Sequence, residues 1–166
     1  MKMKVLQLIK NRRSVRKFKK KTIPAKLIDE ILESGRWAPS GLNNQPWRFM
    51  VLDQESKDSL AEFTHYSRII KGADKVLIVF LDKGASYNYE KDLMAIGACI
   101  QNMLLYIHSK GLGACWLGEI LNQRNEICKL LKTSGSLELE AVIALGYPLS
   151  SNKPTKRKSL KSLMLK

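Results

Sequence analysis

The residues best suited to bind a ligand stand near the start of the chain, where Arg12, Arg13 and Arg16 surround Ser14. A guanidinium group donates paired hydrogen bonds to phosphate or carboxylate oxygens, and a serine hydroxyl adds one more donor. Arg12 and Arg16 can project to a common side of a turn or short strand. The segment therefore indicates either an anion site, with phosphate as the best fit, or a solvated basic loop.

Positive charge is concentrated at the two ends of the chain. Residues 12–21 hold seven Lys/Arg and residues 153–166 hold six, and neither segment contains an acid. The rest is almost neutral, with 16 basic against 15 acidic residues, although the net charge is +14. If the fold brings the ends together, they form one anion site; if not, they are basic tails. A nucleic-acid binder spreads its charge over a face or a helix, so we expect no nucleic-acid partner.

Length and composition indicate one domain over residues 1–166, with 45% hydrophobic residues and a sizeable core. Cys99, Cys115 and Cys128 lie far apart and show no CxxC or Cys/His spacing. We therefore expect no disulfide framework and no metal site, and a reducing cytoplasmic location. Residues 1–13 are too short and too interrupted for a secretory signal.

Hydrophobic periodicity and turn residues predict alternating helices and strands around a single sheet. The predicted helices are 3–11, 24–35, 54–64, 92–110 and 122–132, and the predicted strands are 47–52, 75–81, 112–117 and 139–146. Helix 92–110 is apolar almost all round, but Gln101 and Asn102 interrupt it. We therefore expect a buried helix and not a membrane span.

Two more segments have ligand-binding potential. Residues 38–49, "APSGLNNQPWRF", place backbone and amide donors immediately before a strand, or form a polar turn. Residues 111–119, "GLGACWLGE", contain glycines that allow a flat ligand close to the backbone, or only end a helix and begin a buried strand. The chain has no dinucleotide or P-loop motif and no nucleophile elbow, and His65 and His108 stand alone. Nucleophilic catalysis therefore has little support from these residues.

Taken in order, these segments resemble the FMN-dependent nitroreductase-like oxidoreductases. The resemblance covers essentially the whole chain and rests on five segments: "RRSVRKF", "APSGLNNQPWRF", "GLGACWLG", "VIALGYP" and "KRKSL". It implies an α+β fold with a mostly antiparallel sheet flanked by helices, in an intertwined homodimer.

The resemblance also implies an FMN site on particular residues of this chain. Arg12, Arg13, Ser14 and Arg16 would carry it, with Arg12 and Ser14 at the phosphate and ribityl chain and Arg16 at the pyrimidine side of the ring. Late in the chain Arg157 would clamp the phosphate. The family's usual proline is Ser159 here, so Lys156 or Lys158 could share that role. A loop from the partner subunit would contribute Pro39, Ser40 and Gly41, helped by Asn43, and the backbone of Trp116, Leu117 and Gly118 would line the ring.

The implied activity is transfer of reducing equivalents from NAD(P)H to a small acceptor such as a nitro-aromatic or a quinone. The flavin carries the chemistry, so the protein needs no general acid or nucleophile. In this family a helical lid usually shapes the acceptor pocket. Here only about twenty residues separate the predicted helix 54–64 from residue 85, so the identity of the acceptor stays open. Two alternatives remain: another chemistry on the same fold, such as reductive dehalogenation or oxidation, or a basic protein that binds polyanions.

Overall fold

We describe the protein from a computed structural model, over residues 4–150 and 155–165. Its α-helices are α1 (Val5–Asn11), α2 (Ala25–Arg36), α3 (Gln54–Leu60), α4 (Ser67–Gly72), α5 (Tyr89–Ser109) and α6 (Arg124–Leu130). Its strands are β1 (Trp47–Leu52), β2 (Lys75–Asp82), β3 (Gly113–Leu117) and β4 (Leu137–Gly146). Short 3₁₀ turns are η1 (Gly41–Asn43), η2 (Ala61–Phe63), η3 (Glu119–Gln123) and η4 (Leu160–Leu163).

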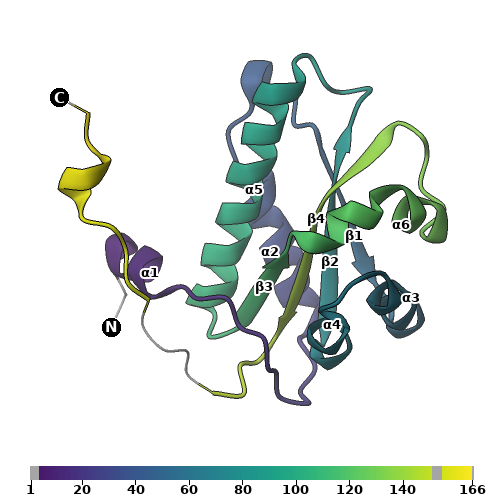
Figure 1. The fold of residues 1–166 in the computed structure, drawn as a ribbon, viewed down its shortest axis with the longest axis horizontal. Helices are drawn as coiled ribbons and strands as arrows, with labels where there is room; N and C mark the ends of the chain where they lie inside the picture. The colour runs from purple at the N-terminus through teal and green to yellow at the C-terminus, as the bar shows by residue number, and fades with distance from the viewer. Residues whose placement is uncertain (1–3, 151–154, 166) are drawn as a thin grey trace.

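The strands form one sheet in the order β1-β2-β4-β3, and every neighbouring pair is antiparallel. Helices lie on both sides of this sheet, with α2 and α5 on one face and α3, α4 and α6 on the other (Figure 1). The predicted fold class, a mostly antiparallel sheet flanked by helices, is confirmed. Strand β3 is an edge strand, a point that matters for the site.

The central strand β2 is buried on both faces. Leu77 and Val79 belong to the core shared with α2 and α5, whereas Ile78 and Phe80 belong to the core under α3, α4 and α6. Alternate side chains of a strand point to opposite faces, so a strand covered on both sides is apolar throughout. This explains the continuous apolar run that predicted the strand.

Helix α5 packs on the sheet along one stripe. Ile96, Ile100, Met103 and Ile107 are all almost completely buried, at the i, i+3, i+4 spacing of one helix face. Met94 on the same helix is 73% exposed, so a single chain does not cover all of its apolar surface. Within the described ranges, we find no helix with the combined length and hydrophobicity needed to cross a bilayer.

The predicted helix 54–64 is α-helical over Gln54–Leu60 and continues as the 3₁₀ turn η2 over Ala61–Phe63, whereas the sequence did not predict helix α4. Helix α3 begins after Asp53, whose side chain accepts a hydrogen bond from the backbone N–H of Ser56 at 2.8 Å, and it ends at Leu60. Helix α4 has only six residues. A helix this short shows no readable period and depends on tertiary packing, here on buried Ile69 and Ile70.

The segment after α1 runs along the sheet beside the end of β4. The backbone N–H of Lys19 donates to the carbonyl of Tyr147 at 2.8 Å, and that of Leu149 donates to the carbonyl of Lys17 at 3.0 Å. The chain beyond residue 154 then passes near α1 (Figure 1). The two basic ends of the chain are therefore brought to the same side of the molecule.

Candidate functional site

A pocket of about 390 Å³ lies between the segment after α1, helix α5 and strand β3. It is lined by Arg12, Ser14, Gln101, Leu104, Ala114, Trp116 and Gly118. Four residues of the predicted flavin site, Arg12, Ser14, Trp116 and Gly118, therefore meet around one hollow although they come from opposite parts of the chain. Leu117, between two of them, is buried on the other side of β3.

Backbone contacts hold Ser14 against the edge strand. Ser14 forms a parallel β-bridge with Ala114, and the N–H of Val15 donates to the Ala114 carbonyl at 2.8 Å. A Cβ on Gly113 would lie 2.4 Å from a methyl carbon of Val15, closer than such atoms can approach. Glycine at this position lets the basic segment pack directly on β3.

Arg12 is the cation of the pocket lining, and two further cations, Arg13 and Arg157, lie near it outside the lining. Partial burial lowers the pKa of Arg12, and the charges of Arg13 and Arg157 lower it further. Arg157 is therefore close enough to repel Arg12 although the two residues lie at opposite ends of the chain. Because guanidinium groups stay protonated, this repulsion is relieved by an anion bound between them.

Arg13 and Arg16 do not line this pocket. Arg13 donates from one nitrogen to the carbonyls of Lys10 at 2.6 Å and Arg12 at 2.8 Å, so it stabilises the end of α1. Arg16 is exposed. Burial raises the pKa of the Cys115 thiol, and the charge of Arg16 opposes this, which places Arg16 near β3.

The loop of Pro39, Ser40, Gly41 and Asn43 lies elsewhere in the chain and does not line the pocket. It has an unusual backbone: Leu42, Asn43 and Gln45 all have positive φ, between 46° and 54°. Non-glycine residues adopt this conformation only where their surroundings impose it. A Cβ on Gly41 would overlap the Tyr87 hydroxyl, so this loop packs tightly on the segment before α5.

Asp92, fully buried near the start of α5, anchors this loop. Its carboxylate accepts hydrogen bonds from Asn44 Nδ2 at 2.8 Å and Ser86 Oγ at 2.6 Å. It also accepts from the backbone N–H groups of Tyr87 and Asn88 at 3.1 and 3.3 Å. Burial would raise the pKa of Asp92, but these hydrogen bonds outweigh burial and hold the pKa below its usual range.

Loop and pocket are separated along α5. The loop is tied to Asp92, whereas the pocket is lined by Gln101, nine residues further along the helix. At a rise of 1.5 Å per residue this is a separation of about 14 Å along the axis. One chain therefore does not bring the two groups of predicted site residues together.

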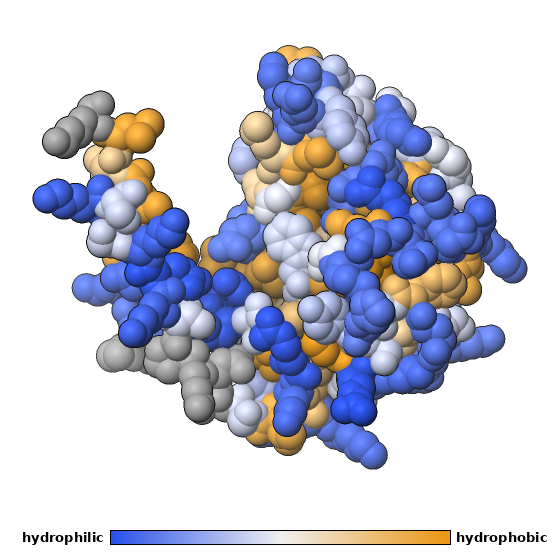
Figure 2. All heavy atoms as spheres, in the orientation of Figure 1, coloured by the Kyte–Doolittle hydropathy of each residue, from blue (hydrophilic) through white to orange (hydrophobic). Residues whose placement is uncertain are grey.

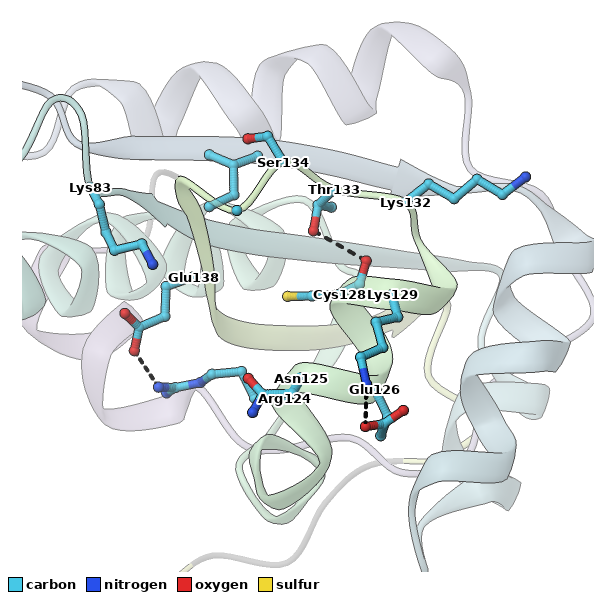
Figure 3. A pocket seen from close by; sticks show the side chains of 12 residues that line it. Lys83, Arg124, Asn125, Glu126, Cys128, Lys129, Lys132, Thr133, Ser134 and Glu138 are labelled. Carbon is cyan, nitrogen blue, oxygen red and sulfur yellow. Dashed lines mark hydrogen bonds and ion pairs between the residues drawn. The ribbon is translucent and has the colours of Figure 1, made fainter.

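A larger hollow of about 630 Å³ lies between α6 and the start of β4 (Figure 3). Arg124 pairs with Glu138 there and reaches Glu140 at 3.4 Å, and Lys129 pairs with Glu126 at 3.0 Å. Burial raises the pKa of Glu140 to about 7, although Arg124 opposes the shift. The predicted flavin-site residues do not line this hollow, and the ion pairs of Arg124 join α6 to β4.

Comparison with known proteins shows the family to which this chain belongs. The model of the nitroreductase family matches residues 9–67 and 64–147, which is most of the chain. The chain belongs to the nitroreductase family. The predicted resemblance and the predicted enzyme class, an oxidoreductase, are confirmed.

Three relatives illustrate which members of the nitroreductase family are similar to this chain. A Methanothermobacter thermautotrophicus protein assigned as an NADH dehydrogenase/NAD(P)H nitroreductase is 36% identical, over 89% of this chain and 78% of its own. An iodotyrosine deiodinase of Thermotoga neapolitana is 32% identical, over 88% and 90%. A Desulfovibrio desulfuricans protein described as a nitroreductase and solved in complex with FMN has 43% identity and a TM-score of 0.95, covering 100% of this chain and 98% of its own.

Sequence reasoning missed three residues of the pocket in this nitroreductase-family chain. Gln101 and Leu104 reach the pocket from α5, and Ala114 reaches it from β3. Gln101 did give a signal, because it interrupts an apolar helix, but we used that only as an argument against a membrane span. No signal in the sequence indicates that Asp92 anchors the loop, because its hydrogen-bond partners become neighbours only in the folded chain.

We predict that Asp92→Ala destabilises the protein by about 3 kcal/mol, because it leaves several buried donors without an acceptor. The midpoint of thermal unfolding should fall by roughly 6–12 °C. Since the folded pKa of Asp92 lies below its unfolded value, its contribution is complete above about pH 4 and is lost as the pH falls through the folded pKa. The variant should therefore lose less stability than the parent between about pH 5 and 3.

Calorimetry across this pH range tests the prediction, with Asp58→Ala as the control. Asp58 is exposed and accepts a hydrogen bond from Gln54, so its removal should change stability by less than about 1 kcal/mol. Equal effects of the two substitutions would contradict the anchoring role of Asp92.

Proposed function

We propose that this chain is an FMN-dependent oxidoreductase that transfers reducing equivalents from NADH or NADPH to a small acceptor such as a nitro-aromatic or a quinone. The observation that carries the proposal is the meeting of Arg12, Ser14 and Gly118 around one pocket, with Arg157 near Arg12. The FMN held by the Desulfovibrio desulfuricans relative, 43% identical, supports the cofactor.

The pocket fits FMN in its charge and its shape. Arg157 lies outside the pocket lining but close enough to repel Arg12, and a phosphate bound beside Arg12 would neutralise both charges. The Ser14 hydroxyl supplies a neutral donor. At Gly118 a Cβ would meet no protein atom within 4 Å, so a side chain there would project into space that a flat ring can occupy. We propose that the backbone of Trp116, Leu117 and Gly118 lies along the ring.

FMN, when bound, supplies the hydride chemistry, and the protein supplies position and electrostatics. Arg12 is the ionisable side chain of the pocket lining. The proposed function assigns no general acid or nucleophile to these residues, because the flavin would carry the chemistry. Arg16, exposed near β3, is proposed to lie at the pyrimidine side, where its charge would favour an electron-rich ring.

A second chemistry on the same site is reductive dehalogenation. The relative that suggests it is the iodotyrosine deiodinase of Thermotoga neapolitana, 32% identical over 90% of its length. Both reactions would use the same proposed FMN site of this chain, so the two functions would differ in the acceptor alone. A basic protein that binds polyanions without flavin is the remaining alternative.

We further propose that the enzyme is a homodimer in which the partner supplies the loop of Pro39, Ser40, Gly41 and Asn43. One chain keeps this loop away from its own pocket. Apolar residues of α1 and of the chain near η4 are also exposed, namely Val5, Leu6, Ile9, Leu160, Leu163 and Met164. Figures 1 and 2 show the C-terminal segment standing clear of the body with apolar side chains on its surface, as an arm that packs on a second copy would.

The function is tested by identifying the chromophore and measuring turnover. Denatured protein should release FMN, and the FMN-loaded protein should oxidise NADH or NADPH in the presence of a quinone or nitro-aromatic. Release of iodide from iodotyrosine in place of that turnover would favour dehalogenation. Colourless protein that takes up no added FMN would contradict both flavin functions.

The convergence of the chain ends predicts a phosphate-specific effect of Arg157. A charge-assisted hydrogen bond contributes roughly 1.5–3 kcal/mol, so Arg157→Ala should weaken FMN binding by about tenfold or more. Riboflavin lacks the phosphate, and its binding should change little. The double substitution with Arg12→Ala should be non-additive, because both residues would contact one group.

Fluorescence titration of the apoprotein with FMN and with riboflavin measures these effects. Lys161→Ala is the matched control, because Lys161 lies in η4 and its substitution removes the same charge from the same basic end of the chain. The assignment of Arg157 to the phosphate fails if Arg157→Ala weakens both ligands equally, or neither.

The homodimer predicts a mass in solution of twice the 18.9 kDa of one chain. Leu160→Asp with Leu163→Asp should shift the protein towards monomer, because carboxylates would replace apolar side chains in the proposed interface. Lys161→Asp adds a carboxylate to the same turn and should leave the dimer intact. Light scattering over a range of concentrations measures both, and a stable, flavin-loaded monomer of the parent chain would refute the proposal.

A further inference from the structure

A third hollow, of about 350 Å³, lies between the segment after the first basic cluster and the helices α3 and α4. Five of its lining residues are lysines, namely Lys19, Lys20, Lys21, Lys57 and Lys71. The others are Thr22, Gln54, Gly72, Ala73 and Asp74. It shares no residue with the pocket of Arg12 and Ser14, so the proposed flavin function leaves these lysines without a role.

Lys57 distinguishes this hollow from an ordinary basic surface, because it is a buried cation. Lys57 is only 3% exposed, although it lines the hollow. Its ammonium group donates to the carbonyl of Ala73 at 2.7 Å, and in the described part of the chain this is its one hydrogen bond. An ammonium group carries three donors, so two remain for a ligand.

Burial lowers the pKa of Lys57, although Asp58 and Asp74 oppose the shift. The charge of this ammonium group is thus incompletely compensated by the protein. A buried cation is stabilised by an acceptor close to it, and the hollow is where such an acceptor can enter.

The one carboxylate of the lining, Asp74, partly offsets the charge of Lys57 and also holds the backbone. Asp74 accepts the backbone N–H of Ile23 at 2.8 Å, which fixes the chain that follows the lysine run. Lys71 pairs with Glu62 at 2.6 Å, outside the lining. Lys21 lies over the ring of Tyr147, 4.2 Å from its centroid, which leaves Lys19 and Lys20 without such a contact in the described chain.

We propose that this hollow is a second anion site, separate from the flavin pocket, that takes a small ligand carrying two or more phosphoryl groups. Lysines bind phosphate as point charges, and several around one hollow suit a ligand with more than one negative charge. A small anion can enter the hollow and reach the buried lysine in its wall, whereas a flat protein surface cannot. A nucleotide and an inorganic pyrophosphate share this chemistry.

Calorimetric titration of the FMN-loaded protein with pyrophosphate tests the site, because excess FMN keeps the flavin pocket filled. We expect one pyrophosphate per chain, with affinity that falls as salt is raised. Lys19→Ala with Lys20→Ala should weaken binding by at least about tenfold. The matched control is Lys129→Ala with Lys132→Ala, which removes the same charge from the hollow of Figure 3.

A second titration, with ADP, distinguishes the two sources of the ligand. Tighter binding of ADP than of pyrophosphate assigns a nucleotide, and the reverse assigns an inorganic or other non-nucleotide phosphate; either supports the site. The proposal is overturned by absence of saturable binding, by equal effects of the two lysine pairs, or by binding that excess FMN abolishes. It is also overturned if a single-stranded oligonucleotide binds more tightly and both lysine pairs weaken it, since that describes a diffuse basic surface.

Discussion

Burial of β2 and β4 on both faces is the constraint on which the rest of the structure depends. The central side chains of both strands are apolar on each face, so helices must cover the sheet on each side. A sheet covered in this way offers a ligand only its edges. Strand β3 is such an edge, and there Trp116 is 44% exposed while its neighbours Cys115 and Leu117 are buried. The position of the pocket thus follows from the packing of the core.

The basic segment near the N-terminus is held at this edge by the backbone. The bond from Val15 to Ala114 does not depend on side-chain type, so it can bring Arg12 and Ser14 to β3 against the repulsion of nearby cations. With Arg157 also close, the folded chain carries an electrostatic cost that an anion removes. A ligand that binds only the folded state stabilises it, so an anion bound at the proposed site would also stabilise the fold.

The loop before β1 is built on a different principle. Leu42, Asn43 and Gln45 have left-handed backbones, which cost free energy, and the buried carboxylate of Asp92 holds the loop in place through Asn44. The loop is fixed at one end of α5 while the pocket opens towards the other. In the proposed dimer, this rigid separation is what gives each site residues from two chains.

Local patterns in the sequence predict the elements of strong periodicity, and they also predict the family. Strand β1 matches its predicted range of 47–52, and helices α2 and α5 match theirs within a few residues, because periodicity and end signals are local. The order of five segments was enough to identify the family. The short helix α4, the pocket positions of Gln101 and Ala114, and the meeting of Lys57 with the N-terminal lysines depend instead on tertiary contacts. Lys57, far from the basic cluster in sequence, joins Lys19 and Lys20 because α3 and α4 pack beside that segment. Such contacts depend on which distant segments the core brings together, and no local pattern records them.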